Sequence, residues 1–283
     1  MGRAVTAARK PDIVCIGAQK AGTSWLHEVL GARPDVWVPP FKELHFFDHR
    51  FVPECRRWTP WHVRRGLKAA RARHLEQVIP PCPAYLAYID RLEQGPPLNA
   101  IWYEYVFSRA EAQQNCLDVT PEYCCIPAAG VAFFARFLPQ TQIVYIIRDP
   151  LDRLKSQVRM IAQRRKDAKL TEADWAQILE MPALRSRGDY LNNVPRWDAH
   201  FGPERLLYLP FGLIRSDPGD ALRQVEAHCA LPAQTPVAAG QKVHATAPLD
   251  LPEAVLGALT ALARPQQRFL EDRFGAGFLQ QIA

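Results

Sequence analysis

The chain has 283 residues, of which 48% are hydrophobic and 23% charged, and its formal net charge is +6. This composition supports a sizeable core and excludes a disordered or fibrous chain. No stretch approaches the roughly 18 consecutive apolar residues of a membrane span, and no N-terminal apolar run indicates secretion, so we expect no stable membrane insertion.

The first third of the chain alternates apolar runs with glycine and proline. Residues 12–17, DIVCIG, predict a buried strand. The segment GTSWLHEVLGARP predicts a helix that Gly31 and Pro34 close, and VWVPP predicts an extended piece. Aromatic residues and prolines obscure the pattern up to residue 115, with helical pieces expected near 62–79 and 83–93.

The rest of the chain predicts three strands and four helices. The strands are expected at 116–119, 142–147 and 205–209, and the helices near 127–138, after Asp149, near 217–230 and near 250–274. Strands that alternate with helices predict an α/β fold, with a P-loop-type parallel β-sheet flanked by helices. We assign residues 1–283 to a single domain with a flexible N-terminus over residues 1–10.

The basic residues indicate the kind of partner, and the cysteines indicate the cellular compartment. Residues 56–75 hold seven Arg or Lys and no acid, and a second basic cluster covers residues 153–169. Such stretches form solvated helix faces or attract anionic ligands. The seven cysteines lack metal-type spacing and indicate reduced thiols, so we expect a cytoplasmic protein.

The segment GAQKAGTS joins the first predicted strand to its helix. Its glycines, Gly17 and Gly22, and its hydroxyls, Thr23 and Ser24, suit a loop that holds phosphate with backbone N–H groups and a helix terminus. A nucleotide-hydrolase loop has lysine directly after the second glycine, but here Lys20 precedes it by two residues. A lysine there can reach a bridging oxygen, which suits sulfuryl transfer without a metal; a P-loop kinase or NTPase is the alternative.

The longer segment GAQKAGTSWL resembles the 5′-phosphosulfate-binding loop of sulfotransferases that use 3′-phosphoadenosine 5′-phosphosulfate. The resemblance implies that Lys20 contacts the phosphosulfate bridge. It also implies a nucleotide-binding role for the residues that follow, namely Ala21, Gly22, Thr23, Ser24 and Trp25.

The segment YIIRDPLDRLKSQ carries the second part of the resemblance, an arginine at a strand end and a serine eight residues later, here Arg148 and Ser156. In the family both grip the 3′-phosphate of the nucleotide. The carboxyl edge of an open α/β sheet is where ligands bind, and the planar fork of arginine suits phosphate. The alternative is a magnesium-binding strand end with Asp149 as ligand; we favour a helix cap for Asp149. Arg153 and Arg159 are expected at the surface or the substrate edge.

Two later positions resemble the family more loosely. Arg187, Gly188 and Tyr190 match a helix start on the nucleotide side, and an ordinary helix entry is an equal alternative. Lys242, in GQKVHATAP, could replace a lysine–glycine pair that relatives place over the nucleotide.

The segment KELHFFD offers candidates for a catalytic base. In an extended stretch Glu43 and His45 point the same way, with Asp48 further along, and aromatic surroundings can raise a carboxyl pKa; a core loop is the alternative. The segment resembles K-E-x-H-F-F-D of the heparan sulfate 3-O-sulfotransferases and N-sulfotransferase-like enzymes. The resemblance implies Glu43 as base, with His45 and Asp48 assisting and His45 as the second choice. Lys42 could polarise the sulfuryl oxygens or contact the acceptor.

The segment DVTPEY resembles a family segment beside the acceptor, so Asp118, Thr120 and Tyr123 are expected to line the cleft; a strand end with a turn is the alternative.

Taken together, the resemblance implies a sulfotransferase, of bacterial type, that transfers a sulfuryl group from 3′-phosphoadenosine 5′-phosphosulfate to a hydroxyl or amine. The product would be 3′-phosphoadenosine 5′-phosphate, and no metal is required. The acceptor would be a glycan, lipid or small molecule, with anionic and aromatic groups suited, and residues 50–115 would form a helical insertion on its side. A non-catalytic polyanion-binding protein is the remaining alternative; we expect no nucleic acid partner.

Overall fold

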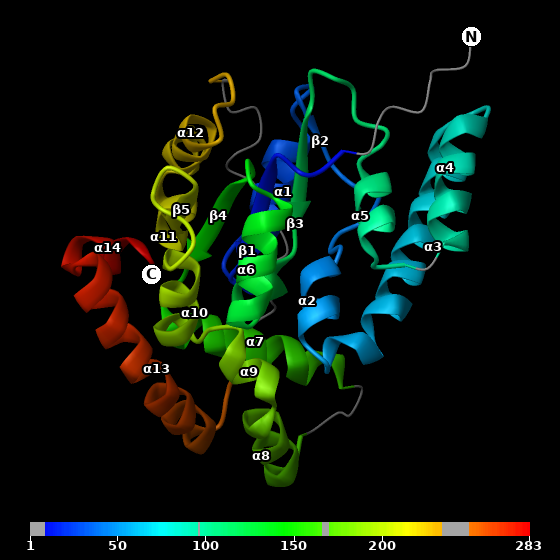
Figure 1. Ribbon diagram of the computed structural model, residues 1–283. Helices are drawn as coiled ribbons and strands as arrows, with labels where there is room; N and C mark the ends of the chain where they lie inside the picture. The colour runs from blue at the N-terminus through cyan, green and yellow to red at the C-terminus, as the bar shows by residue number, and fades with distance from the viewer. Residues whose placement is uncertain (1–8, 96, 166–169, 234–248) are drawn as a thin grey trace.

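Five parallel strands form one sheet in the computed structural model, in the order β2-β3-β1-β4-β5 (Figure 1). The structure describes residues 9–95, 97–165, 170–233 and 249–283. The strands are β1 (Ile13–Gly17), β2 (Val36–Trp37), β3 (Asn115–Val119), β4 (Gln142–Ile147) and β5 (Leu206–Pro210). The predicted α/β class with a parallel sheet is confirmed, and the continuous apolar run of β4 is buried from Ile143 to Ile147.

Strand β1 lies in the middle of the sheet, and later strands are added on both of its sides. Ile13 pairs with Leu117 of β3 on one side and with Gln142 of β4 on the other. Strands β2 and β3 therefore extend the sheet one way, and β4 and β5 extend it the other way. Loops that leave the carboxyl ends of β1 and β4 diverge at this switch point, which is where open α/β sheets bind ligands.

Helices flank the sheet, with α3 and α4 beyond the β2 edge and α11 to α14 beyond the β5 edge (Figure 1). In the first half the helices are α1 (Thr23–Gly31), α2 (Phe46–Phe51), α3 (Thr59–Gln77), α4 (Pro83–Gln94), α5 (Ala100–Val106) and α6 (Ala128–Phe137), with 3₁₀ turns η1 (Cys55–Arg57) and η2 (Pro121–Cys125). The helices expected near 62–79, 83–93 and 127–138 are confirmed within a few residues. The short α2 and α5 were not predicted; Asn99 caps α5 by accepting a hydrogen bond from the Trp102 N–H.

The second half adds a smaller helical core. Its helices are α7 (Pro150–Arg164), α8 (Glu172–Glu180), α9 (Pro182–Ser186), α10 (Tyr190–Asp198), α11 (Phe211–Ser216), α12 (Pro218–His228), α13 (Glu253–Phe274) and α14 (Ala276–Gln281). Buried Leu154, Val158, Ile178, Val255 and Leu259 join α7, α8 and α13 in a cluster separate from the main core. This cluster fixes α7, the helix that follows β4, so the site at the end of β4 has a rigid support.

The described N-terminal residues are anchored. Arg9 donates 2.7 and 2.8 Å hydrogen bonds to the backbone carbonyls of Glu111 and Gln114, and the Lys10 ammonium lies 4.1 Å from the ring centroid of Phe137. The prediction of a flexible segment up to residue 10 is therefore wrong for these two residues. No helix within the described ranges combines the length and apolar character needed to cross a membrane.

Candidate active site

The loop after β1 presents an uncapped helix terminus. Gly22 has φ +91°, and a Cβ there would lie 3.2 Å from Phe211 and Ile214, so the position requires glycine. Helix α1 begins at Thr23 without a side-chain cap. The first N–H groups of α1 therefore lack a side-chain partner, and together with the helix dipole they attract an anion.

Arg148 and Lys20 bring two cations to this loop. Arg148 Nη1 donates a 2.8 Å hydrogen bond to the backbone carbonyl of Lys20, and the guanidinium lies 4.5 Å from the ring centroid of Phe211. Burial, followed by the charge of Arg148, lowers the pKa of Lys20. Arg148 Nε is buried and has no hydrogen-bond partner in the described part of the chain. Two half-buried cations that repel each other favour a bound anion between them.

Lys42 lies over the start of α1. Its Nζ donates hydrogen bonds of 3.2 Å to Thr23 Oγ1 and 3.3 Å to Ser24 Oγ. The segment that carries Glu43 is thereby tied to the predicted anion loop. Lys42 was expected to polarise the sulfuryl oxygens or to contact the acceptor, and it lies both beside the anion loop and in the lining of the cavity described below.

The other residues predicted to hold the nucleotide with Arg148 differ in burial. Ser156 lies in α7, half-buried, eight residues after Arg148. Tyr190 is fully buried, and its hydroxyl accepts a 3.3 Å hydrogen bond from the Arg148 N–H. Tyr190 therefore supports the backbone of Arg148 and does not line the site, which corrects its predicted contact with the nucleotide. Lys242 lies outside the described residues.

Arg153 is a buried structural cation. It is 1% exposed and donates hydrogen bonds to Gln157 Oε1 (2.6 Å) and to the backbone carbonyl of Leu184 (3.2 Å). A Cβ at Gly188 would lie 2.2 Å from the Arg153 guanidinium, so Gly188 makes room for it. The expectation that Arg153 lies at the surface or the substrate edge is wrong.

Asp149 caps α7, as predicted. Its Oδ1 accepts a 2.8 Å hydrogen bond from the Asp152 N–H, and its Oδ2 accepts one of 3.0 Å from Gln267 Nε2. Both carboxylate oxygens are engaged, and Arg148 is the preceding residue. These contacts argue against Asp149 as a magnesium ligand.

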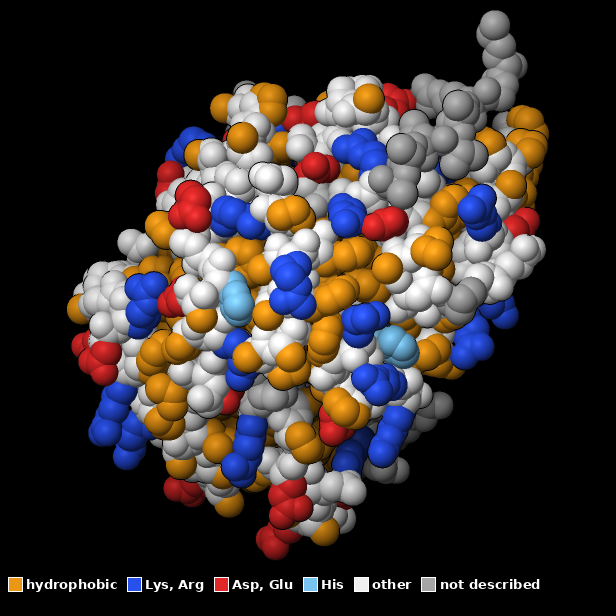
Figure 2. All heavy atoms as spheres, viewed as in Figure 1, with side chains coloured by type: hydrophobic (Ala, Val, Ile, Leu, Met, Phe, Trp, Pro, Cys, Tyr) orange, Lys and Arg blue, Asp and Glu red, His pale blue; other side chains and the backbone are white. Residues whose placement is uncertain are grey.

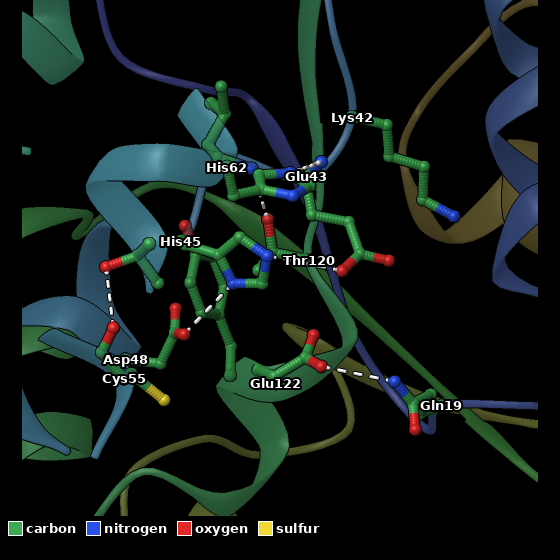
Figure 3. A network of polar contacts seen from close by, with 12 residues as sticks. Gln19, Lys42, Glu43, His45, Asp48, Cys55, His62, Thr120 and Glu122 are labelled. Atoms are coloured by element: carbon green, nitrogen blue, oxygen red, sulfur yellow. Dashed lines mark hydrogen bonds and ion pairs between the residues drawn. The ribbon is translucent and has the colours of Figure 1, made fainter. Parts of the chain in front are cut away.

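Glu43, His45 and Asp48 form a chain of polar contacts (Figure 3). His45 Nε2 lies 3.4 Å from Glu43 Oε2, and His45 Nδ1 lies 3.0 Å from Asp48 Oδ2. The Glu43 N–H donates to His62 Nε2 at 3.2 Å. The side chain of Glu43 is 24% exposed, whereas those of His45 and Asp48 are 1% and 0% exposed. Glu43 is thus the member that a substrate can reach.

Glu122 completes the cluster, although no motif singled it out. Its Oε1 lies 2.8 Å from Arg187 Nη2 and accepts a 3.2 Å hydrogen bond from Gln19 Nε2. Arg187 Nη1 also donates to Gln19 Oε1 at 2.9 Å. Glu122 lies in η2, just after β3, at the carboxyl edge of the parallel sheet. This position could have identified Glu122 as a site residue from the sequence, because ligands bind at that edge.

Burial and charge set the protonation of the cluster. Burial would raise the pKa of Glu43, but the His45 hydrogen bond and charge, with Lys42, lower it to about 2. Burial would lower the pKa of His45, but Asp48 and Glu43 raise it well above its usual value. Burial and the negative charge of Glu43 raise the pKa of Glu122 to about 7. Of these two glutamates, Glu122 therefore has the raised pKa, not Glu43 as expected.

Glu43, His45 and Glu122 place ligand-type atoms within 4.8 Å of one another. A divalent cation could bridge such a set. However, the charges are already compensated, because His45 is held protonated between Glu43 and Asp48 and Arg187 pairs with Glu122. The cluster is therefore charge-compensated by its own side chains.

Asp118, Thr120 and Tyr123 lie inside the protein and do not line a cleft. They are 1%, 0% and 0% exposed. Thr120 and Tyr123 donate to Asp118, and they accept hydrogen bonds from the N–H groups of Leu44 and Phe46 at 3.0 Å. These contacts hold the backbone around His45 in place. This corrects the prediction that the three side chains contact an acceptor.

A cavity of about 440 Å³ opens beside Lys42. The lining residues are His27, Val38, Pro39, Pro40, Phe41, Lys42, His62, Arg65, Gly66, Ala69 and Arg73. Three of them, Lys42, Arg65 and Arg73, are cations, whereas burial lowers the pKa of His27 and of His62. The cavity is lined from α1, α3 and the segment after β2. Figure 2 shows Lys and Arg side chains gathered where α2 and α3 lie in Figure 1. The cavity reaches Lys42 and His62, and His62 accepts a hydrogen bond from the Glu43 N–H.

Comparisons with known proteins bear on the family and the fold. The model of the sulfotransferase family matches residues 11–235. A sulfotransferase from Alicyclobacillus acidocaldarius has a similar structure, with a TM-score of 0.68, 19% identity, and coverage of 93% of this chain and 95% of that one. The sulfotransferase domain of the Synechococcus PCC 7002 olefin synthase gives a TM-score of 0.52 at 16% identity, covering 94% and 98% of the two chains. The sulfotransferase domain from the curacin biosynthetic pathway gives 0.52 at 13% identity, covering 98% and 97%. No curated protein sequence matches the chain.

Proposed function

The chain belongs to the sulfotransferase family, and from that premise we propose that it transfers a sulfuryl group from 3′-phosphoadenosine 5′-phosphosulfate to a hydroxyl or amine of an acceptor. In this proposal Glu43 is the base and Lys20, Lys42 and Arg148 bind the donor. The contact that carries it is the tie from Lys42 Nζ to Thr23 and Ser24, which brings a carboxylate to the mouth of the anion loop.

The donor site follows from the cations around α1. The 5′-phosphosulfate would lie on the uncapped start of α1, with Lys20 and Lys42 on its oxygens. The unpartnered Nε and the position of Arg148 at the end of β4 suit a second phosphate, gripped by the guanidinium. The residues fit the donor, which supplies the sulfuryl group and leaves as the bisphosphate.

The acceptor oxygen must attack sulfur in line with the leaving bridging oxygen, and a base must take the proton of the acceptor. As the acceptor oxygen attacks sulfur, its O–H bond breaks and the proton passes to Glu43, while the bridging S–O bond breaks and the 5′-phosphate takes its electron pair. Lys20 and Lys42 stabilise the charge that develops on the bridging and sulfuryl oxygens. His45 and Asp48 hold Glu43 in place.

We place the acceptor in the basic cavity, next to Lys42 and His62. Its lining favours an acceptor that carries a carboxylate, sulfate or phosphate beside the hydroxyl or amine that is modified. Helix α3 supplies much of this wall, so in this proposal residues 50–115 lie on the acceptor side. The basic lining and the Glu43 segment are also compatible with the heparan sulfate-type branch.

Transfer of ³⁵S-sulfuryl from labelled donor to a panel of acceptors tests the proposal. The panel contains neutral, anionic and aromatic alcohols and amines. We expect transfer by the wild-type protein and a loss of about 10²–10⁴-fold in kcat for Glu43→Gln, because the base is removed. Glu54→Gln, an exposed carboxylate before α3, is the matched control and should retain full activity.

Full transfer by Glu43→Gln would remove Glu43 as the base. The donor half is tested separately by calorimetry, comparing adenosine 3′,5′-bisphosphate with AMP and with ATP–magnesium. Tighter binding of the bisphosphate supports the proposal, whereas a preference for ATP–magnesium supports a P-loop kinase or NTPase.

A further inference from the structure

Glu122 is a buried carboxyl that the proposed chemistry leaves without a role. It is 3% exposed, and one of its carboxylate oxygens, Oε2, has no hydrogen-bond partner among the described residues. The other oxygen is held by Gln19 and Arg187. A buried carboxylate oxygen left unpaired is costly, so its position calls for an explanation.

The unpaired side of Glu122 is turned to Glu43. Figure 3 shows the two carboxyl groups facing each other, with the His45 ring beside them. Their oxygens lie within 4.8 Å of each other and of a His45 nitrogen, and they can hydrogen-bond once one carries a proton. Glu43 is the exposed member of the pair, with 24% of its side chain accessible against 4% for Glu122.

Titratable groups from the adjoining elements surround the pair. They are Lys42, His45 and Asp48 from the segment around α2, Cys55 from η1, Cys124 and Cys125 from η2, and Arg187 after α9. Arg187 and His45 are the cations that face Glu122. Because the two carboxyls are this close, they lose their protons in two separate steps, and the two apparent pKa values describe the pair and not either residue alone.

We propose that Glu43 and Glu122 act together as one base, in which Glu43 takes the acceptor proton and Glu122 supplies the second negative charge that holds it. The inference rests on the proposed function. Although burial would raise the pKa of Glu43, the adjacent His45 and Lys42 lower it, so Glu43 acting alone would be a weak base. When both carboxyls are ionised, the first proton to bind is governed by the higher of the two pKa values of the pair, which is about 7.

The steps balance in protons. The doubly ionised pair receives one proton from the acceptor as the O–S bond forms, and this proton is shared between the two carboxyls. It returns to solvent through Glu43, which is the exposed member. Glu122 touches no substrate and is a positioning residue that acts through Glu43.

Infrared difference spectroscopy titrates the pair without donor or acceptor. In the wild-type protein we expect a protonated-carboxyl C=O band that disappears with an apparent pKa near 7. Glu122→Gln should lose the part of this band that titrates near pH 7, while a part from buried Asp118, whose pKa is raised to about 6, remains. In Glu43→Gln the part near pH 7 should titrate at least one pH unit lower, because the like charge is gone. Glu54→Gln is the control and should leave the band unchanged.

The pH dependence of kcat/KM gives the second readout, with the acceptor found by the ³⁵S assay. We expect activity to rise through the same apparent pKa in wild type. Glu122→Gln should shift this limb to lower pH by at least one unit and lower kcat at least tenfold at pH 8. Circular dichroism checks that each variant folds.

A wild-type protein with no carboxyl band titrating above pH 6, or a Glu122→Gln variant with an unchanged pH profile, would overturn the shared base. If no acceptor takes label while the band behaves as expected, the sulfuryl-transfer proposal fails and the paired carboxyls stand. The two failures are therefore distinct.

Discussion

Arg148 Nη1 donates a 2.8 Å hydrogen bond to the backbone carbonyl of Lys20. This bond joins the end of β4 to the loop after β1, at the switch point between the two halves of the sheet. The residue proposed for the second phosphate thus also fixes the loop proposed for the first. A change at Arg148 is expected to act on both ends of the nucleotide.

Replacing Arg148 by alanine should weaken the binding of adenosine 3′,5′-bisphosphate more than the binding of AMP. The loss of a charge-assisted phosphate contact predicts a fall of about 10–100-fold for the bisphosphate and a smaller fall for AMP. Isothermal titration calorimetry measures both. Arg185→Ala, an exposed arginine at the end of α9, is the control. Equal losses for the two ligands would mean that Arg148 acts only on the loop.

Replacing Tyr190 by phenylalanine should change bisphosphate binding by less than about fivefold. Its hydroxyl is buried and accepts one hydrogen bond, of 3.3 Å, from the Arg148 N–H. Removing such a bond costs on the order of 1 kcal/mol. The same calorimetric series tests this prediction, and a loss as large as that of Arg148→Ala would restore Tyr190 as a nucleotide contact.

Replacing Lys42 by methionine should lower kcat by about 10²–10³-fold, because a cation that faces the sulfuryl oxygens is lost. The methylene stem is kept, so packing against the cavity wall changes little. Lys42→Arg should recover part of the rate, since it retains the charge over Thr23 and Ser24. Steady-state kinetics with labelled donor provide the measurement. If kcat is retained and only the KM for acceptor rises, Lys42 belongs to the acceptor site.

Replacing Arg65 and Arg73 together by alanine should raise the KM for an anionic acceptor about tenfold or more and leave a neutral analogue unaffected. Both line the cavity beside Lys42. Arg64→Ala is the control, because Arg64 is exposed on the same helix and bonds the backbone carbonyl of Pro60. A matching rise for the neutral analogue would point to lost packing rather than lost charge.

Glu122 should make stability depend on pH. Its folded pKa, about 7, lies above its usual 4.5, so the folded protein binds more protons between these values and ionisation of Glu122 destabilises it as pH rises. Relative to wild type, Glu122→Gln should therefore gain on the order of 1–3 kcal/mol in unfolding free energy between pH 5 and pH 8. Urea denaturation at several pH values measures this. A difference that does not vary with pH would contradict the raised pKa.

The local elements were readable from the sequence because short-range patterns specify them. The apolar run of β4, the Pro150 helix start with its Asp149 cap, and the glycines around the loop depend on nearest neighbours. The helices that were missed are short or depend on distant packing. Helix α11, for example, packs against the C-terminal α14, and a Cβ at Gly212 would lie 2.3 Å from the Gln281 carbonyl.

The motifs located the site but did not decide each side chain's role. The spacing of Asp118, Thr120 and Tyr123 fitted a cleft, but the structure turns all three inward as supports. Tyr190 and Arg153 were misplaced for the same reason. The direction in which a side chain points depends on which element covers it, and a linear pattern carries little of that information.

By itself, the sequence determined the α/β class, the strand–loop–helix that offers an anion site, and the presence of a carboxylate beside a histidine at residues 43 and 45. Only the tertiary structure decided which carboxyl is protonated. Glu43 and Glu122 are 79 residues apart in sequence (122 − 43). Their electrostatic coupling exists because β2 and β3 pair, which brings together the segments that follow these two strands and carry the two carboxyls. Burial and the distance between charges are properties of the folded chain, and they set these pKa values.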